Sequence, residues 1–198
     1  VGSEMCIRDR DSSDRKNVLK VLKKSKITQG EEVLKFEVNL KKYFKSKYCV
    51  AVSNGSAALH LVAKALKWKK DDKVICSPIT FISAINAILH VGAKPLFVDI
   101  NLNDYSLDLD LVEQKLKKDK KIKAMIVTDY AGQPSDWLRI NKFKKKYNIQ
   151  LVNDNCHAIG SKINNDHGYA VKFSDAVCLS FHPVKTITTG EGGAILTN

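Results

Sequence analysis

The sequence predicts an α/β fold built on a seven-stranded, mainly parallel sheet with helices on both faces. Apolar runs of strand length recur along the chain, helix-like patterns separate the first five, and the runs are apolar enough to be buried on both faces. The predicted strands span residues 48–52, 73–76, 94–98, 123–127, 149–153, 176–180 and 193–197. The predicted helices between the first five strands span residues 56–67, 80–91, 108–118 and 136–147.

Two further helices are expected before the first strand. Apolar residues at helical spacing predict a short amphipathic helix over residues 14–24 and a second helix over 31–46. Residues 1–12 show no periodicity, do not begin with methionine and resemble a translated adapter or a cloning scar. We therefore expect a non-native or disordered tail (1–12), an N-terminal helical segment (13–46) and one large domain (47–198).

The composition is that of a soluble globular protein with a strong positive charge. Hydrophobic residues make up 44% of the chain and charged residues 27%, and the formal net charge is +12. Of the 33 basic residues, 29 are lysines spread along the chain rather than arginines clustered with aromatic residues. This pattern does not favour nucleic-acid binding. A phosphorylated substrate or a lysine-rich codon bias explains the charge as well.

The cysteines and the apolar runs favour a cytoplasmic location. None of the five cysteines forms a CxxC pair, and three lie within apolar runs, which predicts free thiols in a reducing compartment and no structural zinc or other metal. No apolar run approaches the roughly 18 residues that a membrane span needs. The N-terminus lacks the apolar core of a signal peptide. We expect a cytoplasmic protein without membrane contacts.

Ligands of parallel α/β sheets bind beyond the carboxyl ends of the strands, so the residues that follow each strand are the first candidates. After the first strand, Gly55 permits a tight turn, and Ser56 can begin a helix whose free amides could bind an anion. An ordinary helix cap is the alternative, and neither GxGxxG nor GxxxxGK[ST] occurs. After the second strand, Pro78 forces a turn, and Phe81 could stack on a flat ligand or belong to the core.

The segment after the fifth strand brings a carboxylate and an imidazole close together. Asp154 directly follows an apolar strand, where an ionised carboxylate is costly unless it is paired. His157 lies on the same face if a helical turn begins there. Cys156, beside His157, could be a thiol nucleophile or a metal ligand, although one neighbouring pair is weak evidence for either role.

One lysine stands out in the turn after the sixth strand. Ser180 ends an apolar run, and a proline and three glycines then exclude helix interior over residues 183–193, where Lys185 is the only lysine. A nucleophilic lysine needs such a position, near a group that can lower its pKa from the ordinary value of about 10.4. An ordinary surface lysine is the alternative, and the candidates upstream favour the functional interpretation.

Six ordered blocks resemble the DegT/DnrJ/StrS sugar-nucleotide aminotransferases, which are fold-type I pyridoxal phosphate (PLP) enzymes. The resemblance runs from about residue 15 to the end, and it implies the large, PLP-binding domain of that fold. The last block is most similar to the branch that aminates UDP-4-keto-6-deoxy-N-acetylhexosamines, as in pseudaminic acid synthesis. The blocks are TQGEEVLKFE (28–37), NGSAALHL (54–61), SPITFISAINAILHVGAKPLFVDI (77–100), DYAGQPSD (129–136), NDNCHAIGS (153–161) and SFHPVKTITTGEGGAILTN (180–198).

The resemblance implies roles for the candidates around the cofactor ring. Lys185 would bind PLP as a Schiff base and move protons during the reaction. Asp154 would pair with the pyridine nitrogen and keep it protonated. His157 would hold the phenolic oxygen of the ring, and Phe81 would stack on its face.

The resemblance also implies the contacts to phosphate and substrate. The cofactor phosphate would be bound by Ser56, by the amide of Ala57 and by Ser180, at the start of a helix. The sugar nucleotide would contact the loop formed by Thr28, Gln29 and Gly30.

The reaction implied is a transamination. Relatives that dehydrate sugars carry histidine at the position of Lys185, so the lysine favours amine transfer from glutamate to a UDP-linked 4-keto sugar. The alternative is a non-catalytic regulatory homologue that binds PLP or a nucleotide sugar, and Lys185 together with Asp154 argues against it because a binder needs neither. Family members form homodimers with the active site at the interface, and they continue into a smaller C-terminal domain. We therefore expect this chain to be a fragment that is weakly active or inactive alone.

Overall fold

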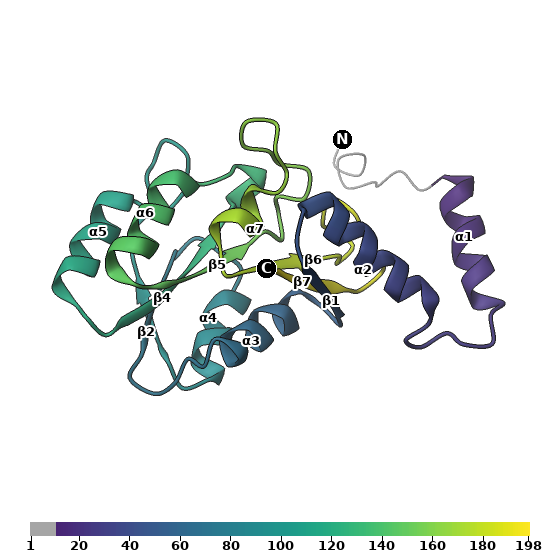
Figure 1. Ribbon diagram of the computed structural model, residues 1–198, viewed down its shortest axis with the longest axis horizontal. Helices are drawn as coiled ribbons and strands as arrows, with labels where there is room; N and C mark the ends of the chain where they lie inside the picture. Colours follow the sequence, from purple (N-terminus) through teal and green to yellow (C-terminus); the bar gives the residue numbers. More distant parts are fainter. Residues whose placement is uncertain (1–10) are drawn as a thin grey trace, which may run out of the picture.

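The computed structural model describes residues 11–198, so most of the predicted tail lies outside the described residues. Helix α1 (Ser12–Leu22) starts two residues before the predicted helix. Asp11 and Asp14 form a capping box at its start, which is the reason for the earlier boundary. No residue of α1 is buried, and Figure 1 shows this helix standing apart from the rest of the molecule.

Helix α2 (Glu31–Phe44), in contrast, is part of the main body. It begins after Gly30 and ends at Lys45, whose backbone is left-handed, as at many helix ends. Its apolar face buries Leu40 and Phe44 in the same hydrophobic core as the sheet. The second half of the predicted N-terminal segment therefore packs on the large domain.

The seven predicted strands form one sheet, which confirms the predicted fold class. The order across the sheet is β1-β7-β6-β5-β4-β2-β3. Strand β7 runs antiparallel to both neighbours, whereas the β2–β3, β2–β4, β4–β5 and β5–β6 pairs are parallel. The strands are β1 (Tyr48–Val52), β2 (Lys73–Cys76), β3 (Lys94–Phe97), β4 (Ile122–Thr128), β5 (Gln150–Asp154), β6 (Ala176–Ser180) and β7 (Gly193–Thr197).

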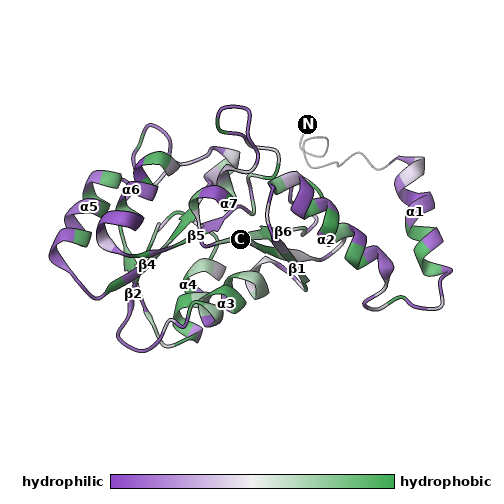
Figure 2. Cartoon of the chain, in the orientation of Figure 1, coloured by the Kyte–Doolittle hydropathy of each residue, from purple (hydrophilic) through white to green (hydrophobic). Residues whose placement is uncertain are grey.

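Helices cover both faces of the sheet (Figures 1 and 2). One face carries α3 (Gly55–Ala65) and α4 (Ser83–His90), and the other carries α2 with α5 (Leu109–Lys118), α6 (Trp137–Tyr147) and α7 (Tyr169–Phe173). The short helix α7 and the 3₁₀ turn η2 (Tyr130–Gly132) were not predicted, because so few residues show no helical periodicity.

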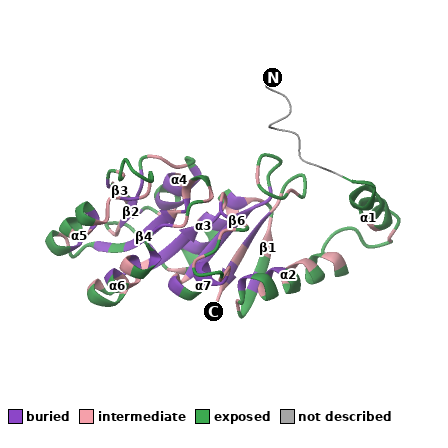
Figure 3. Cartoon of the chain, turned by 90° about the horizontal axis from the view of Figure 1, so that it is seen from above, coloured by how far each residue is buried: buried purple, intermediate pink, exposed green. Residues whose placement is uncertain are grey.

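The two cores result from the alternation of side chains along each strand. Neighbouring residues such as Leu151 and Val152, or Val177 and Cys178, belong to different hydrophobic clusters on opposite faces of the sheet. The buried residues accordingly concentrate along the central strands in Figure 3. Among residues 11–198, none of the helices combines the length and apolarity that crossing a membrane requires.

Candidate active site

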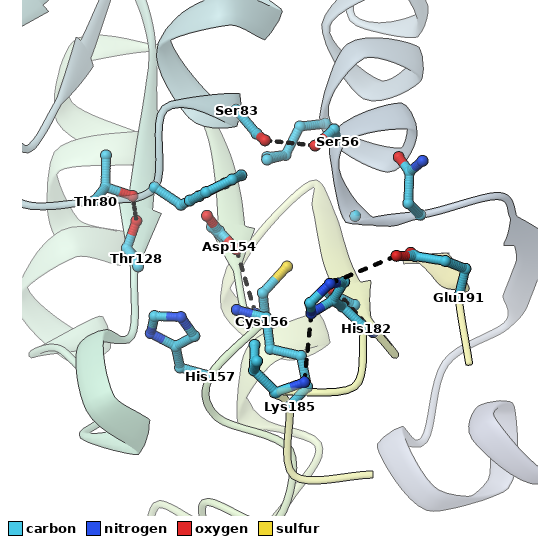
Figure 4. A pocket seen from close by; sticks show the side chains of 16 residues that line it. Ser56, Thr80, Ser83, Thr128, Asp154, Cys156, His157, His182, Lys185 and Glu191 are labelled. Atoms are coloured by element: carbon cyan, nitrogen blue, oxygen red, sulfur yellow. Dashed lines mark hydrogen bonds and ion pairs between the residues drawn. The ribbon is translucent and has the colours of Figure 1, made fainter. Parts of the chain in front are cut away.

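A cavity of about 320 Å³ opens at the carboxyl ends of the parallel strands. Residues at or just after the ends of five strands line it: Asn54 after β1, Thr80 after β2, Thr128 in β4, Asp154 in β5 and Ser180 in β6. Figure 4 shows side chains from these separate elements converging on one hollow. This is the edge at which the sequence predicted ligand binding.

The start of helix α3 forms one wall of the cavity. The side chain of Asn54 accepts a hydrogen bond from the amide of Ala57 at 2.8 Å, and its carbonyl accepts one from Ala58 at 3.1 Å. The first four amides of a helix have no partner within the helix, so the caps leave those of Gly55 and Ser56 beside the cavity. The Ala57 amide, predicted to bind an anion, donates to Asn54 in this structure.

A close approach of two backbones holds this wall in place. A Cβ atom added to Gly55 would lie 2.9 Å from Cβ of Ser180 and 3.1 Å from Sγ of Cys156. Only glycine therefore lets α3 approach the end of β6 this closely. Ser56 is fixed from the other side, because its hydroxyl lies 2.5 Å from that of Ser83 at the start of α4.

Phe81 lies at the mouth of the cavity and is 67% exposed. This exposure excludes the core alternative and leaves the ring free to contact a ligand. Beside it, the hydroxyl groups of Thr80 and Thr128 are hydrogen bonded at 3.0 Å (Figure 4). The loop before α4 is thereby tied to the end of β4.

Asp154 brings a buried carboxylate to the cavity. It is only 4% exposed and accepts a hydrogen bond from the amide of Cys156 at 3.2 Å. Across residues 11–198, no lysine or arginine forms an ion pair with it. A buried carboxylate without a cationic partner suits a ligand that supplies a positively charged donor.

The pKa values of two residues close to Asp154, Cys156 and His157, are shifted by burial and by nearby charges. Burial, reinforced by the charge of Asp154, raises the pKa of Cys156 well above its ordinary value, so the thiol stays protonated and is a poor nucleophile or metal ligand. The pKa of His157 is lowered by burial and by the charge of Lys185, with Asp154 opposing both. The imidazole is therefore neutral at pH 7.

Lys185 lies in a turn braced by its own backbone. Its amide donates to the carbonyl of His182 at 2.9 Å, and the Val184 amide donates to Nδ1 of His182 at 3.3 Å. His182 and Glu191 face each other across the turn, with Nε2 and Oε1 3.6 Å apart. The side chain of Lys185 lines the same cavity as Asp154 and His157 (Figure 4).

The comparison with known proteins decides the family. The sequence profile of the DegT/DnrJ/EryC1/StrS aminotransferase family matches residues 8–198. This chain belongs to that family. The match begins inside the predicted 1–12 tail, and residues 8–10 of it lie outside the described part of the structure.

Individual relatives of this family member act on nucleotide sugars. The UDP-4-amino-4,6-dideoxy-N-acetyl-beta-L-altrosamine transaminase of Campylobacter jejuni is 38% identical over 189 residues, which are 95% of this chain and 49% of the relative. The aminotransferase PseC of Helicobacter pylori, involved in the biosynthesis of pseudoaminic acid, superimposes with a TM-score of 0.88 at 33% identity, covering 96% of this chain and 50% of PseC.

A second solved structure contains a cofactor. It is NtdA from Bacillus subtilis with bound cofactor PMP, which superimposes with a TM-score of 0.86 at 28% identity and covers 94% of this chain and 42% of NtdA. This chain thus spans about half the length of the relatives it matches.

Not every predicted site residue lies at the cavity. Ser56, Phe81, Asp154, His157, Ser180 and Lys185 line it. Thr28, Gln29 and Gly30 lie in the loop between α1 and α2 and are not among its lining residues. Their predicted contact with the sugar nucleotide stays a prediction.

The cavity also contains residues that the sequence analysis did not single out. The polar ones are Asn54, Thr80, Ser83, Thr128, His182 and Glu191, and the apolar ones are Leu59 and Val184. Thr128 could have been found from its position at the end of a predicted strand. His182 and Glu191 flank Lys185 in the same sequence block, and that proximity was the available signal.

Proposed function

We propose that residues 47–198 form the PLP-binding large domain of a sugar-nucleotide aminotransferase. The observation that supports this most directly is the convergence of Lys185, Asp154 and His157 on one cavity at the strand ends. The match to the family, which covers all of the described residues, agrees with it.

The chemistry of the cavity fits PLP. The cofactor has an anionic phosphate, a basic pyridine nitrogen and an aldehyde that reacts with an amine. The start of α3 offers free amides and the Ser56 hydroxyl to an anion. Asp154 offers a buried carboxylate without a cation, and Lys185 offers the amine.

Each residue then has a defined task. Asp154 would hold a proton on the pyridine nitrogen, and neutral His157 would donate a hydrogen bond to the phenolic oxygen. Phe81 would cover one face of the ring. Lys185 would hold the cofactor covalently between turnovers and move a proton at its Nζ atom during the reaction. Bound PLP would supply an electron sink and carry the amino group between donor and acceptor.

Phosphate binding would involve the start of α3 and the end of β6. Ser56 and Ser180 both line the cavity there, held by Ser83 and by the close approach of Gly55. The Ala57 amide could join them only if the Asn54 side chain released it. We therefore assign the main phosphate contacts to the two serines and to the first amides of the helix.

The proposed substrate is a UDP-linked 4-keto-6-deoxy-N-acetylhexosamine, with glutamate as the amino donor. Two observations support this choice: the 38% sequence identity to the altrosamine transaminase of Campylobacter jejuni, and the sequence of the block around Lys185. The loop with Thr28, Gln29 and Gly30 would contact the sugar nucleotide. Because that loop lies away from the cavity in a single chain, the proposal includes a homodimer in which it reaches the partner's site. A cytoplasmic location is part of the same proposal.

The test uses the complete protein that contains this chain. The protein is loaded with pyridoxamine phosphate and mixed with a UDP-linked 4-keto-6-deoxy-N-acetylhexosamine, and the product is analysed by mass spectrometry. A GDP-linked 4-keto-6-deoxyhexose serves as the comparison substrate and Lys185→Ala as the control. We expect the unmodified protein to transfer the amine to the UDP sugar and the Lys185→Ala variant not to. A folded, cofactor-loaded protein that aminates neither sugar would contradict transamination and favour the regulatory homologue.

A further inference from the structure

A buried carboxylate outside the cavity accepts an unusual number of hydrogen bonds. Asp129 directly follows β4, is 0% exposed and does not line the cavity. Its Oδ1 accepts from the Ser135 amide and from Trp137 Nε1, both at 2.9 Å. Its Oδ2 accepts from Asn153 Nδ2 at 3.1 Å, Asn155 Nδ2 at 3.2 Å and the Tyr169 hydroxyl at 2.8 Å.

Two of these donors flank the site carboxylate. Asn153 and Asn155 reach Asp129, whereas Asp154 between them and Cys156 after them line the cavity. The backbone adds a direct link, because the amide of Asp129 donates to the carbonyl of Asp154 at 3.3 Å. Asp129 thus holds the backbone on both sides of Asp154 without touching the cavity.

The two asparagines depend on Asp129. Both are 0% exposed, and their Oδ1 atoms have no hydrogen-bond partner within the described residues. Their side-chain amides are therefore anchored only through their Nδ2 donors, which bind Asp129 and, for Asn155, also the Tyr169 hydroxyl. Losing the carboxylate would leave the buried side-chain amide of Asn153 without an acceptor and that of Asn155 with only the Tyr169 hydroxyl.

The geometry points to Asp129 as a positioning residue: it fixes the segment from Asp154 to His157 so that both side chains face the cavity. This inference rests on the proposed function for the meaning of that segment. The physical claim, that Asp129 orders the segment, can be tested without any cofactor.

The test compares Asp129→Asn with Leu116→Ala in the chain as it stands. Leu116 is a buried residue of α5 in the hydrophobic core and does not belong to the Asp129 network, so its loss destabilises the fold elsewhere. Amide hydrogen exchange is followed in the peptide 153–161 and in a reference peptide from α3. We expect Asp129→Asn to accelerate exchange at residues 155–158 about tenfold relative to α3, as the loss of a charged hydrogen bond would.

The inference would be overturned if Asp129→Asn accelerated exchange by the same factor in both peptides, or if the two variants accelerated residues 155–158 equally. Either result would mean that Asp129 contributes only to overall stability. If Asp129→Asn does not fold, Tyr169→Phe removes one donor and should produce a smaller acceleration at the same residues. Tyr169→Phe without any local effect would equally overturn it.

A second readout connects the segment to the site. In the wild-type chain with PLP added, the pH dependence of the cofactor absorbance should shift in Asp129→Asn and stay unchanged in Leu116→Ala. A wild-type chain that does not bind PLP would count against the proposed function, while the exchange data would still decide whether Asp129 orders the segment.

Discussion

Burial lowers the pKa of His157, and the charge of Lys185 lowers it further across the cavity that both side chains line. Replacing the lysine should therefore raise the pKa of the imidazole, although burial keeps it below the ordinary value of 6.5. The measurement is an NMR titration of His157 in the wild-type chain and in Lys185→Ala. Lys162→Ala is the control on a lysine outside the cavity. An unchanged His157 pKa in Lys185→Ala would place the two residues too far apart for the proposed site.

The lowered pKa of His157 also predicts how stability depends on pH. The unfolded chain binds a proton at this histidine more readily than the folded chain does, so this group's contribution is complete above the unfolded pKa and is lost as the pH falls below about 6.5. Denaturant unfolding at pH 5 and at pH 8 should therefore show a smaller pH effect in His157→Gln than in the wild type. An equal pH effect on the stability of both proteins would contradict the lowered pKa of His157.

Gly55→Ala should strain the contact between α3 and the end of β6. The new methyl group would lie 2.9 Å from Cβ of Ser180, and overpacking of this kind costs about 1–3 kcal/mol of unfolding free energy. Unfolding in denaturant measures the cost, with Lys64→Ala on the exposed face of the same helix as the control. Adding Ser180→Gly removes the clashing carbon and should recover part of the loss. Full stability in Gly55→Ala would mean that the two backbones can separate freely.

Asn54→Ala removes the cap of α3. We expect a loss of about 1 kcal/mol in unfolding free energy, because the Ala57 amide loses its acceptor. Asn54→Asp keeps a side-chain acceptor and should retain most of the stability. If Asn54→Ala and Asn54→Asp were equally unstable, the hydrogen bond to Ala57 would not be the cause.

Glu113 links α5 to α6 in a pH-dependent way. Its carboxylate accepts hydrogen bonds from Lys146 Nζ at 2.8 Å and from the Tyr147 hydroxyl at 2.9 Å, which lower its pKa from 4.5 to about 2. For a carboxyl group with a lowered pKa, the stabilisation is complete above the unfolded value and is lost as the pH falls through the folded value. The stability difference between wild type and Glu113→Gln should therefore disappear between about pH 4.5 and 2.

Two lysine variants serve as controls for the Glu113 prediction. Lys146→Met removes the principal hydrogen-bond donor and should reduce the pH-dependent difference. Lys145→Met, on the neighbouring position, should not change it. A difference that persists at pH 2 would contradict the lowered pKa.

The strands were predictable because each is a short apolar run, and strands buried on both faces need no polar alternation. Helix boundaries were less certain where a side chain decides them. Helix α1 starts early because Asp11 caps it, and α4 starts at Ser83, after a turn that follows Pro78. The five-residue α7 shows too little periodicity to be recognised.

At the site, position relative to a strand end was the useful signal. It singled out Asp154 and Ser180 as candidates, and both line the cavity. It could not identify the Asp129 network, because the partners of that carboxylate come from residues 135–169 and meet only in the folded chain. Nor could it show that Asn54 occupies the Ala57 amide, since capping depends on a side-chain rotamer.

The most direct test of the account asks whether Lys185 is the lysine that binds the cofactor. The purified chain is incubated with PLP, dialysed and examined by visible absorption, then reduced with borohydride and digested for peptide mass spectrometry. Lys185→Ala and Lys64→Ala are treated in parallel. The account predicts retained absorption that borohydride abolishes, with the reduced label on Lys185, in the wild type and in Lys64→Ala but not in Lys185→Ala. A label on another lysine, or absorption that survives in Lys185→Ala, would contradict it.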